Sequence, residues 1–314
     1  MILLWGLPGD EPLSVVFDLL HEQDAEVTFL DQREVLSTEV EVSCNRALTG
    51  TLWARGAAID LSRVDAVYLR PYDTRRLPCI ADALSREGNT SPAYAYALAV
   101  EEALTAWCEA TDALVINRPS AMASNTSKPY QASLIAAHGF LVPDTLITTD
   151  PDAVTEFWQQ HGEIVYKSVS GVRSIVKKMT SEERNRIDDL RWCPTQFQQF
   201  IEGTDYRIHV VGEDTFASQI VSGAADYRYA RSQGADLQIT PTRLSEDVLT
   251  SCHRLAHSLR LPVAGIDLRR TTQGAWYCFE VNPSPGFTFY DTSGQQLIAR
   301  AIVRLLSQAA VAAQ

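Results

Sequence analysis

The chain has 314 residues, of which 46% are hydrophobic; this is enough apolar material to bury more than one core, so two or three subdomains are expected. A formal net charge of −12 at pH 7 argues against nucleic acid or an acidic membrane as a partner, because both are bound through basic patches. Residues 1–7 carry no basic leader and are too short for a spanning helix, so neither a signal sequence nor a membrane anchor is expected.

The cysteines indicate a reducing compartment. They are scattered along the chain, with no Cys-x-x-Cys pair and no His at ligand spacing, which is typical of free thiols rather than of disulfides or a zinc site. A cytoplasmic location is therefore expected. The six are Cys44, Cys79, Cys108, Cys193, Cys252 and Cys278.

The first part of the chain, residues 1–113, alternates short apolar segments with helical patterns. Strands are expected at residues 2–7, 26–30 and 66–69, and helices at residues 13–22 and 94–108. This alternation is typical of a small α/β domain.

The second part, residues 114–196, begins with a short strand at 114–117 and continues through a polar connection. A helix is expected at 128–138, and another begins at Pro151, where Asp150 can cap the first turn. An apolar strand then follows at residues 164–168, and it ends in a loop of small residues.

The third part, residues 197–314, predicts mostly antiparallel strands. One amphipathic helix is expected at 246–259, capped by Ser245, and a closing helix at 299–312. The fold class expected for the whole chain is therefore α/β, with α+β lobes after the first domain.

A polar hairpin near the end of the chain is the most informative feature. Residues 263–270 and 275–281 are rich in β-branched, aromatic and apolar residues, and Gln273-Gly274 predicts a two-residue turn. Counting back along the ladder from that turn places Asp267 opposite Glu280, with their Cβ atoms ~5 Å apart on one face.

Two facing carboxylates repel, so this pair needs a cation, a shared proton or deep hydration. Asn282 projects from the same face as Glu280, because strand side chains alternate with period two. Carboxylate and amide oxygens suit Mg²⁺, which is usually held by one or two carboxylates together with substrate phosphates. The alternative is an exposed polar hairpin face that binds nothing.

Two lysines are placed where an anion is expected. Lys167 ends an apolar strand and precedes small residues whose backbone N–H groups can approach phosphate; the alternative is a solvated strand end. Lys128 stands at a helix start, where the dipole disfavours a cation unless it and the helix terminus hold an anion together.

Residues 205–210 alternate polar and apolar side chains. Asp205, Arg207 and His209 share one face of this predicted strand, and the guanidinium fork of Arg207 suits a phosphate or a carboxylate. The alternative is the solvated side of a sheet, and His209 is more simply a hydrogen-bonded neighbour than a catalyst. Hydrolase motifs such as Gly-x-Ser-x-Gly and His-Glu-x-x-His do not occur.

Together these residues resemble the RimK-like branch of the ATP-grasp superfamily. The resemblance runs from about Asn117 to the C-terminal helix, and its most specific element is Glu280-Val281-Asn282-Pro283-Ser284-Pro285-Gly286. Further segments are similar to the subgroup that includes microviridin-type peptide ligases. These are Val67-Tyr68-Leu69-Arg70-Pro71, Asn117-Arg118-Pro119-Ser120-Ala121 with Lys128 and Gln131, and Asp226-Tyr227-Arg228.

The resemblance implies an ATP-grasp fold with a pre-ATP-grasp domain at 1–113, a central lobe at 114–196 and a C-terminal lobe with the metal site at 197–314. It also implies a nucleotide site. Phosphates would be contacted by Lys128 and Lys167, and ribose hydroxyls by Asp205. The adenine-facing linker between the lobes would be formed by Gln198, Gln199, Phe200 and Ile201.

The resemblance further implies the catalytic residues and the metal ligands. Two Mg²⁺ ions, for which Mn²⁺ could substitute, would be held by Asp267, Glu280 and Asn282. Arg207 would steady the transferring phosphate or the acyl-phosphate, and the backbone at Ser284 and Gly286 would lie near the reacting carboxylate. This chain departs from the family at Gln199, where many relatives have Glu, and at loop 168–174, which is shorter and poorer in Gly than the usual lid.

The function implied is that of an ADP-forming carboxylate–amine ligase that acts through an acyl-phosphate. One alternative is a peptide-modifying ligase that forms side-chain ester or amide crosslinks on a precursor. Another is a non-catalytic ATP-binding regulatory protein, which would not need the complete metal set. Three loop arginines, Arg228, Arg231 and Arg243, could bind a substrate carboxylate, although such arginines are commonly just solvated. The expected partners are an amino acid or peptide substrate and a second copy of the chain in a homodimer, without nucleic acid or membrane.

Overall fold

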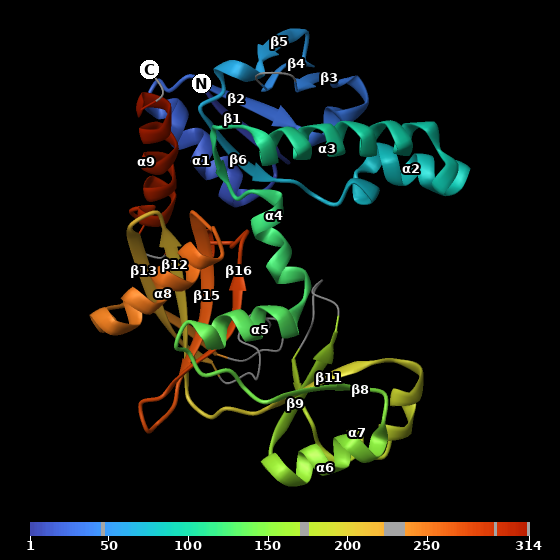
Figure 1. The fold of residues 1–314 in the computed structure, drawn as a ribbon, viewed down its shortest axis with the longest axis vertical. Coiled ribbons are helices and arrows are strands. Elements are labelled where there is room, and N and C mark those ends of the chain that lie inside the picture. Colours follow the sequence, from blue (N-terminus) through green and yellow to red (C-terminus); the bar gives the residue numbers. More distant parts are fainter. Residues whose placement is uncertain (45–47, 170–175, 223–235, 292–293, 313–314) are drawn as a thin grey trace. The chain divides into compact units, whose positions relative to one another are not determined.

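The computed structural model describes residues 1–44, 48–169, 176–222, 236–291 and 294–312, which form two compact units (Figure 1). Unit 1 comprises residues 1–121, 261–263 and 286–314, and unit 2 comprises residues 122–260 and 264–285. The chain therefore passes between the units more than once. The three-part division at residues 113 and 196 stays a prediction.

Unit 1 is built on a parallel four-stranded sheet with the order β2-β1-β6-β7. All five residues of β1 are buried, as is typical of a parallel strand covered on both faces. A parallel sheet is the arrangement that the alternating pattern predicted for this part of the chain. The strands are β1 (Ile2–Gly6), β2 (Val27–Asp31), β6 (Ala66–Arg70) and β7 (Leu114–Ile116).

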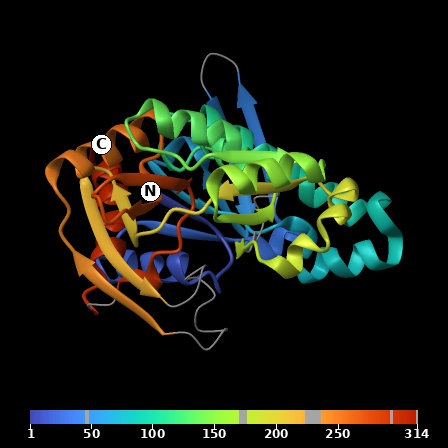
Figure 2. The ribbon, with the colours of Figure 1, turned by 90° about the horizontal axis from the view of Figure 1, so that it is seen from below.

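Four longer helices accompany this sheet. α1 (Glu11–Glu22) lies beside α9 (Leu297–Ala312), from the other end of the chain, and α9 also packs on β1 and β6 (Figures 1 and 2). α2 (Pro78–Glu87) packs on α3 (Pro92–Ala110). α1 begins where the Asp10 carboxylate accepts a hydrogen bond from the Leu13 amide at 3.0 Å.

The Asn-Arg-Pro segment after β7 has a structural role. Arg118 donates to four backbone carbonyls at the end of α3, those of Cys108, Glu109, Thr111 and Ala113, at 2.7 to 3.1 Å. Its guanidinium thereby satisfies carbonyl groups that a helix end leaves without intrahelical partners. The short helix α4 (Pro119–Met122) follows directly.

A second sheet in unit 1 was missed by the sequence analysis. It is antiparallel and consists of β3 (Glu39–Cys44), β4 (Leu48–Ala54) and β5 (Ala57–Asp60), with β3 in contact with α3. Its strands are only partly buried and carry Glu, Ser, Thr and Gly, so they lack the apolar runs by which the other strands were recognised.

Unit 2 contains an antiparallel sheet with the order β10-β9-β11-β8. α6 (Pro151–His161) packs beside β8, and Asp150 caps it as predicted by accepting from the Asp152 amide. The apolar cluster of this part includes Val154, Ile164, Met179 and Phe197. Its elements are β8 (Thr145–Thr148), β9 (Ile164–Ser168), β10 (Lys177–Lys178), α7 (Ser181–Arg184) and β11 (Thr195–Gln199).

The other sheet of unit 2 has the order β14-β13-β12-β15-β16. α8 (Glu246–Ser258) packs on β12, and α5 (Lys128–Ala137) packs on β16. Ser245 occupies the N-cap position of α8, but its side chain makes no capping hydrogen bond, so that detail of the prediction was wrong. The strands are β12 (Thr204–Val211), β13 (Asp214–Ser222), β14 (Leu237–Thr242), β15 (Val263–Arg270) and β16 (Trp276–Asn282).

One buried amide fixes α5 against β16. The Gln131 side chain donates to the Val281 carbonyl at 2.8 Å and accepts from the Val281 amide at 3.0 Å. Gln131 is 1% exposed, so these two bonds satisfy groups that water cannot reach. These bonds fix the position of α5 beside Val281, the residue that follows Glu280.

Candidate active site

The predicted carboxylate pair is present on the β15–β16 hairpin. Asp267 lies directly opposite Glu280 in the ladder, and Asn282, opposite Gly265, lies two pairs further along and hence on the same face. The predicted two-residue turn was wrong, because the Thr271 amide bonds the Ala275 carbonyl at 2.9 Å and encloses three residues.

A β-bulge restores the register that the longer turn changes. Asp267 pairs with Glu280 but its neighbour Leu268 pairs with Cys278, so Phe279 is an extra residue in β16. A bulge re-aims side chains at a sheet, and here both Phe279 and Glu280 line the same pocket. The turn contains one residue more than predicted, and β16 contains one unpaired residue. The two changes offset each other, so Asp267 still lies opposite Glu280.

Each carboxylate is neutralised by a cation of the protein. Lys128 Nζ lies 2.5 Å from Glu280 Oε1 and also donates to the Asn125 side chain at 2.9 Å. Arg207 Nη1 lies 2.8 Å from Asp267 Oδ1. Lys128 and Arg207, predicted as phosphate contacts, thus form ion pairs with the predicted metal ligands Glu280 and Asp267.

Arg207 occupies a slot made by its neighbours. Its side chain is 6% exposed, and its Nε donates to His209 Nε2 at 3.4 Å. A Cβ at position 265 would lie 2.6 Å from Arg207 Cζ and 2.7 Å from Pro285 Cβ, so only glycine leaves room for the guanidinium. Since Arg207 and His209 are both buried, this face of β12 is not the solvated side of a sheet.

The oxygen donors present fit Mg²⁺. Asp267 and Glu280 are partly exposed and face each other, and the Asn282 side-chain oxygen lies beside them and accepts from the Ser284 amide at 2.9 Å. Among the described residues no group of three His, Cys, Asp or Glu could hold a metal. Two carboxylates and an amide instead suit an ion that takes its remaining ligands from phosphate and water.

Cys278 lies in the same strand, two residues before Glu280. Burial raises the pKa of its thiol well above the ordinary value, so it remains protonated at neutral pH. The thiol is therefore unsuited to act as a nucleophile at this site.

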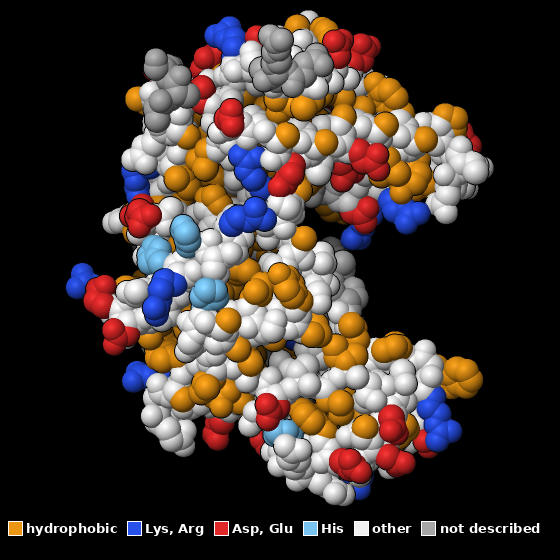
Figure 3. Space-filling model, viewed as in Figure 1, with side chains coloured by type: hydrophobic (Ala, Val, Ile, Leu, Met, Phe, Trp, Pro, Cys, Tyr) orange, Lys and Arg blue, Asp and Glu red, His pale blue; other side chains and the backbone are white. Residues whose placement is uncertain are grey.

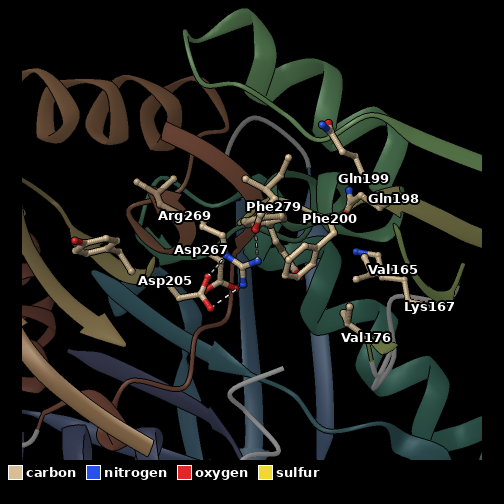
Figure 4. Close-up of a pocket in the computed structure, with 14 residues that line it drawn as sticks. Val165, Lys167, Val176, Gln198, Gln199, Phe200, Asp205, Asp267, Arg269 and Phe279 are labelled. Atoms are coloured by element: carbon tan, nitrogen blue, oxygen red, sulfur yellow. Dashed lines mark hydrogen bonds and ion pairs between the residues drawn. The ribbon is translucent and has the colours of Figure 1, made fainter. Parts of the chain in front are cut away.

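A pocket in unit 2 lies beside the hairpin (Figure 4). Lys167 and Val165 line it from β9, Asp205 from β12, and Asp267 and Arg269 from β15. Lys167 pairs with Gln196 in the ladder and therefore shares a sheet face with Val165 and Gln198. Four of the predicted phosphate, ribose and metal residues, Lys167, Asp205, Asp267 and Glu280, thus line one pocket with residues 198–201. Lys128, Arg207 and Asn282 are not among its lining residues.

The two glutamines of the predicted linker differ in direction. Gln198 is 8% exposed and donates to the Thr145 hydroxyl at 3.0 Å. Gln199 is the next residue of β11, so its side chain leaves the opposite face, and Figure 4 shows its amide directed away from the Asp205 carboxylate. The chain then leaves the strand through Phe200 and Ile201.

Arg269 was missed by the sequence analysis. It holds both oxygens of Asp205, from Nε to Oδ1 at 2.7 Å and from Nη2 to Oδ2 at 2.8 Å, as the dashed lines in Figure 4 show. The signal available in the sequence was its position two residues after Asp267, which places both side chains on one strand face.

The remaining predicted residues are those of the segment after the hairpin and the three loop arginines. Ser284 is partly exposed and Gly286 is exposed after the hairpin. Arg243 is exposed just after β14, whereas Arg228 and Arg231 lie outside the described residues. On the face drawn in Figure 3, acidic and basic side chains are interspersed. No helix within the described ranges is long and apolar enough to cross a membrane, and the cytoplasmic location stays a prediction.

Comparison with known proteins identifies the family. A family model described as the RimK-like ATP-grasp domain matches residues 125–306. The probable alpha-L-glutamate ligase of Xylella fastidiosa (strain M12) is 28% identical over 198 residues. That match covers 60% of this chain and 65% of the relative, which is less than two thirds of the relative's length.

Solved structures are similar over nearly the whole chain. The ATP-grasp ligase PsnB, complexed with a phosphomimetic variant of minimal precursor, Mg and ADP, has a TM-score of 0.81 at 25% identity and covers 98% of both chains. The macrocyclase MdnC from Microcystis aeruginosa MRC, bound with precursor peptide MdnA, has a TM-score of 0.80 at 20% identity, which shows the fold alone. It covers 98% of this chain and 99% of MdnC. The predicted fold class is confirmed, and the chain belongs to the RimK-like ATP-grasp family.

Proposed function

We propose that the protein is an ATP-dependent, ADP-forming ligase that joins a carboxylate to an amine through an acyl-phosphate. The observation that carries this proposal is the facing pair Asp267–Glu280 with Asn282 beside it, each carboxylate bound to a cation suited to phosphate. Membership of the family supports the same class of reaction.

The residues of the pocket divide the task of holding the nucleotide. Among the lining residues, we assign phosphate contact to Lys167, ribose hydroxyls to Asp205, and the adenine-facing wall to residues 198–201 and Phe279. Lys128, which is paired with Glu280 of the pocket, is proposed as a second phosphate contact. Lysine serves as a compact point charge for phosphate, whereas a carboxylate accepts from hydroxyl groups.

The metal would be held by Asp267, Glu280 and Asn282, as one or two Mg²⁺ ions. When bound, it would supply electrostatic stabilisation of charge on the transferring phosphoryl group. The Arg207 fork would bind that group as it passes to the substrate carboxylate, and the backbone at Ser284 and Gly286 would lie near the acid. An amine then attacks the acyl carbon of the acyl-phosphate and inorganic phosphate leaves.

The substrate is proposed to be a peptide rather than a free amino acid. PsnB and MdnC carry precursor peptides in their structures and are similar to this chain from end to end, whereas the glutamate ligase of X. fastidiosa matches only 60% of it. The product would be a side-chain ester or amide crosslink; an ester requires a hydroxyl in place of the amine.

The test is ADP release from the purified protein with Mg²⁺ and ATP. One panel contains free amino acids and the other contains Asp/Glu-rich peptides. Release with peptides is expected, while release with amino acids alone would contradict the peptide assignment. ATP binding without release on either panel would favour the non-catalytic regulatory alternative.

The predicted homodimer is a separate proposal. Sedimentation velocity of the full chain at two concentrations tests it, and a single species of about 35 kDa, the mass of one 34.8 kDa chain, at both would contradict it.

A further inference from the structure

Arg269 links three separate parts of the nucleotide pocket. Besides both oxygens of Asp205 in β12, it binds the Ile201 carbonyl in the linker, from Nη1 at 2.8 Å. Its guanidinium lies 5.1 Å from the centroid of the Phe279 ring and 5.8 Å from that of Phe200. The side chain is only 15% exposed, so these contacts leave it little freedom to rotate.

We propose that Arg269 is a positioning residue for ribose recognition, acting through Asp205. This inference rests on the nucleotide site proposed above. The fork of Arg269 binds both oxygens of Asp205, which fixes the plane of the carboxylate that would accept from the ribose hydroxyls.

The positive charge of Arg269 also favours nucleotide binding beside Asp205. A carboxylate without a cation would repel the nearby phosphates of a nucleotide, whereas the Asp205–Arg269 pair is neutral. Lysine cannot replace this arginine, because an ammonium group has neither the planar fork nor a flat face for the two rings. Arg269 thus sets the carboxylate in position before the nucleotide arrives.

The experiment is calorimetric titration of the full-length protein with ADP and with 2′,3′-dideoxy-ADP in Mg²⁺. The readout is the ratio of the two dissociation constants, which a general loss of stability does not change. The variants are Arg269→Lys, Arg269→Met and Asp205→Asn. The matched control is Arg270→Met, because Arg270 is the exposed neighbour and lies over the Trp276 ring.

We expect the wild type and Arg270→Met to prefer ADP by about tenfold or more, as for a hydrogen bond to a charged group. Both Arg269 variants and Asp205→Asn should bring the ratio close to one, and adding Arg269→Met to Asp205→Asn should not lower it further.

The inference and the proposed function fail in different ways. A ratio in both Arg269 variants within about twofold of the wild type, with Asp205→Asn still losing the preference, would overturn the positioning role alone. A wild type that binds ADP without preferring it would overturn the ribose role of Asp205, and with it this inference. A wild type that binds neither ligand would overturn the proposed nucleotide site itself.

Discussion

The four charged side chains at the hairpin neutralise one another in pairs. Lys128 binds Glu280 and Arg207 binds Asp267, although the proposed function gives the cations to phosphate and the carboxylates to metal. When Mg²⁺ and nucleotide bind, Asp267 and Glu280 would therefore change from a protein cation to the metal, and Lys128 and Arg207 from a carboxylate to phosphate. Metal alone would displace cations that have no phosphate to bind, so metal and nucleotide are expected to bind cooperatively.

Removing either metal carboxylate should abolish turnover without unfolding the protein. Asp267→Asn and Glu280→Gln keep the side-chain volume but remove the charge, and a loss of about a hundredfold or more in ADP release is expected. The measurement is ADP release over a Mg²⁺ titration, with circular dichroism melting as the control for folding. Near-wild-type release at saturating Mg²⁺ from either variant would contradict the metal assignment.

Lys167→Ala should weaken ATP much more than adenosine. Its proposed partner is phosphate, and loss of one charge-assisted hydrogen bond corresponds to about 1.5–3 kcal/mol, or roughly ten- to a hundredfold in affinity. Calorimetric titration with both ligands checks this. Equal losses for the two ligands would show that Lys167 supports the strand end rather than the phosphates.

The sequence suggested several of the residues that line the pocket, but not the partners they have in the fold. Lys167 could be selected because a charged residue at the end of an apolar strand needs a reason, and Asp267 because the hairpin register places it opposite Glu280. Asp205 was selected through the family resemblance, and all three line one pocket. The pairing of Lys128 with Glu280 could not be foreseen, because the two lie far apart in the chain and meet only when α5 packs on β16. Arg269 was missed since an arginine near a strand end is unremarkable until its contacts are known.

At the scale of elements, one glycine makes room for a proposed catalytic arginine. In Gly265→Ala the new methyl group would overlap the Arg207 guanidinium, since its Cβ would lie 2.6 Å from Cζ. Displacing Arg207 should lower ADP release by about a hundredfold, as for the loss of one transition-state donor, with a much smaller effect on ADP affinity.

The control for this prediction is Gly9→Ala, because a Cβ at Gly9 would have nothing within 4 Å. It should release ADP at the wild-type rate. An unchanged rate in Gly265→Ala would mean that Arg207 is able to move aside without cost, and would remove it from the proposed chemistry.

Elements with a strong apolar pattern could be predicted, and partly exposed ones could not. β1, α1, α6, β9 and β15 lie within a few residues of their predicted bounds, because periodic burial and capping residues marked them. The sheet β3–β5 was missed, as its strands face solvent on one side and its register depends on partners rather than on an apolar run.

At the scale of the whole molecule, the first domain is not separable by a single cut. α9, at the other end of the chain, belongs to unit 1, where Ile298, Ile302 and Leu306 are buried and the helix packs on α1, β1 and β6. The predicted boundary at residue 113 marks a change of pattern, but the sequence could not show that the last helix returns to the first domain.

A fragment of residues 114–314 should therefore expose the apolar face of α9. We expect it to bind the dye ANS and to sediment as aggregates, whereas the full chain does neither. Removing α9 as well, in a fragment of residues 114–296, should reduce the dye binding. A monomeric 114–314 fragment without dye binding would show that α9 does not need residues 1–113 to cover its apolar face.

The number of residues between Asp267 and Glu280 does not reveal whether the hairpin contains the bulge at Phe279. A two-residue turn without a bulge and a three-residue turn with one both bring Asp267 opposite Glu280. Only the second arrangement also turns Phe279 into the pocket beside Arg269. Relatives with the same number of residues between the two carboxylates can thus share a metal site and still differ in the wall that meets the nucleotide base, so equal spacing in an alignment does not imply equal selectivity for the base.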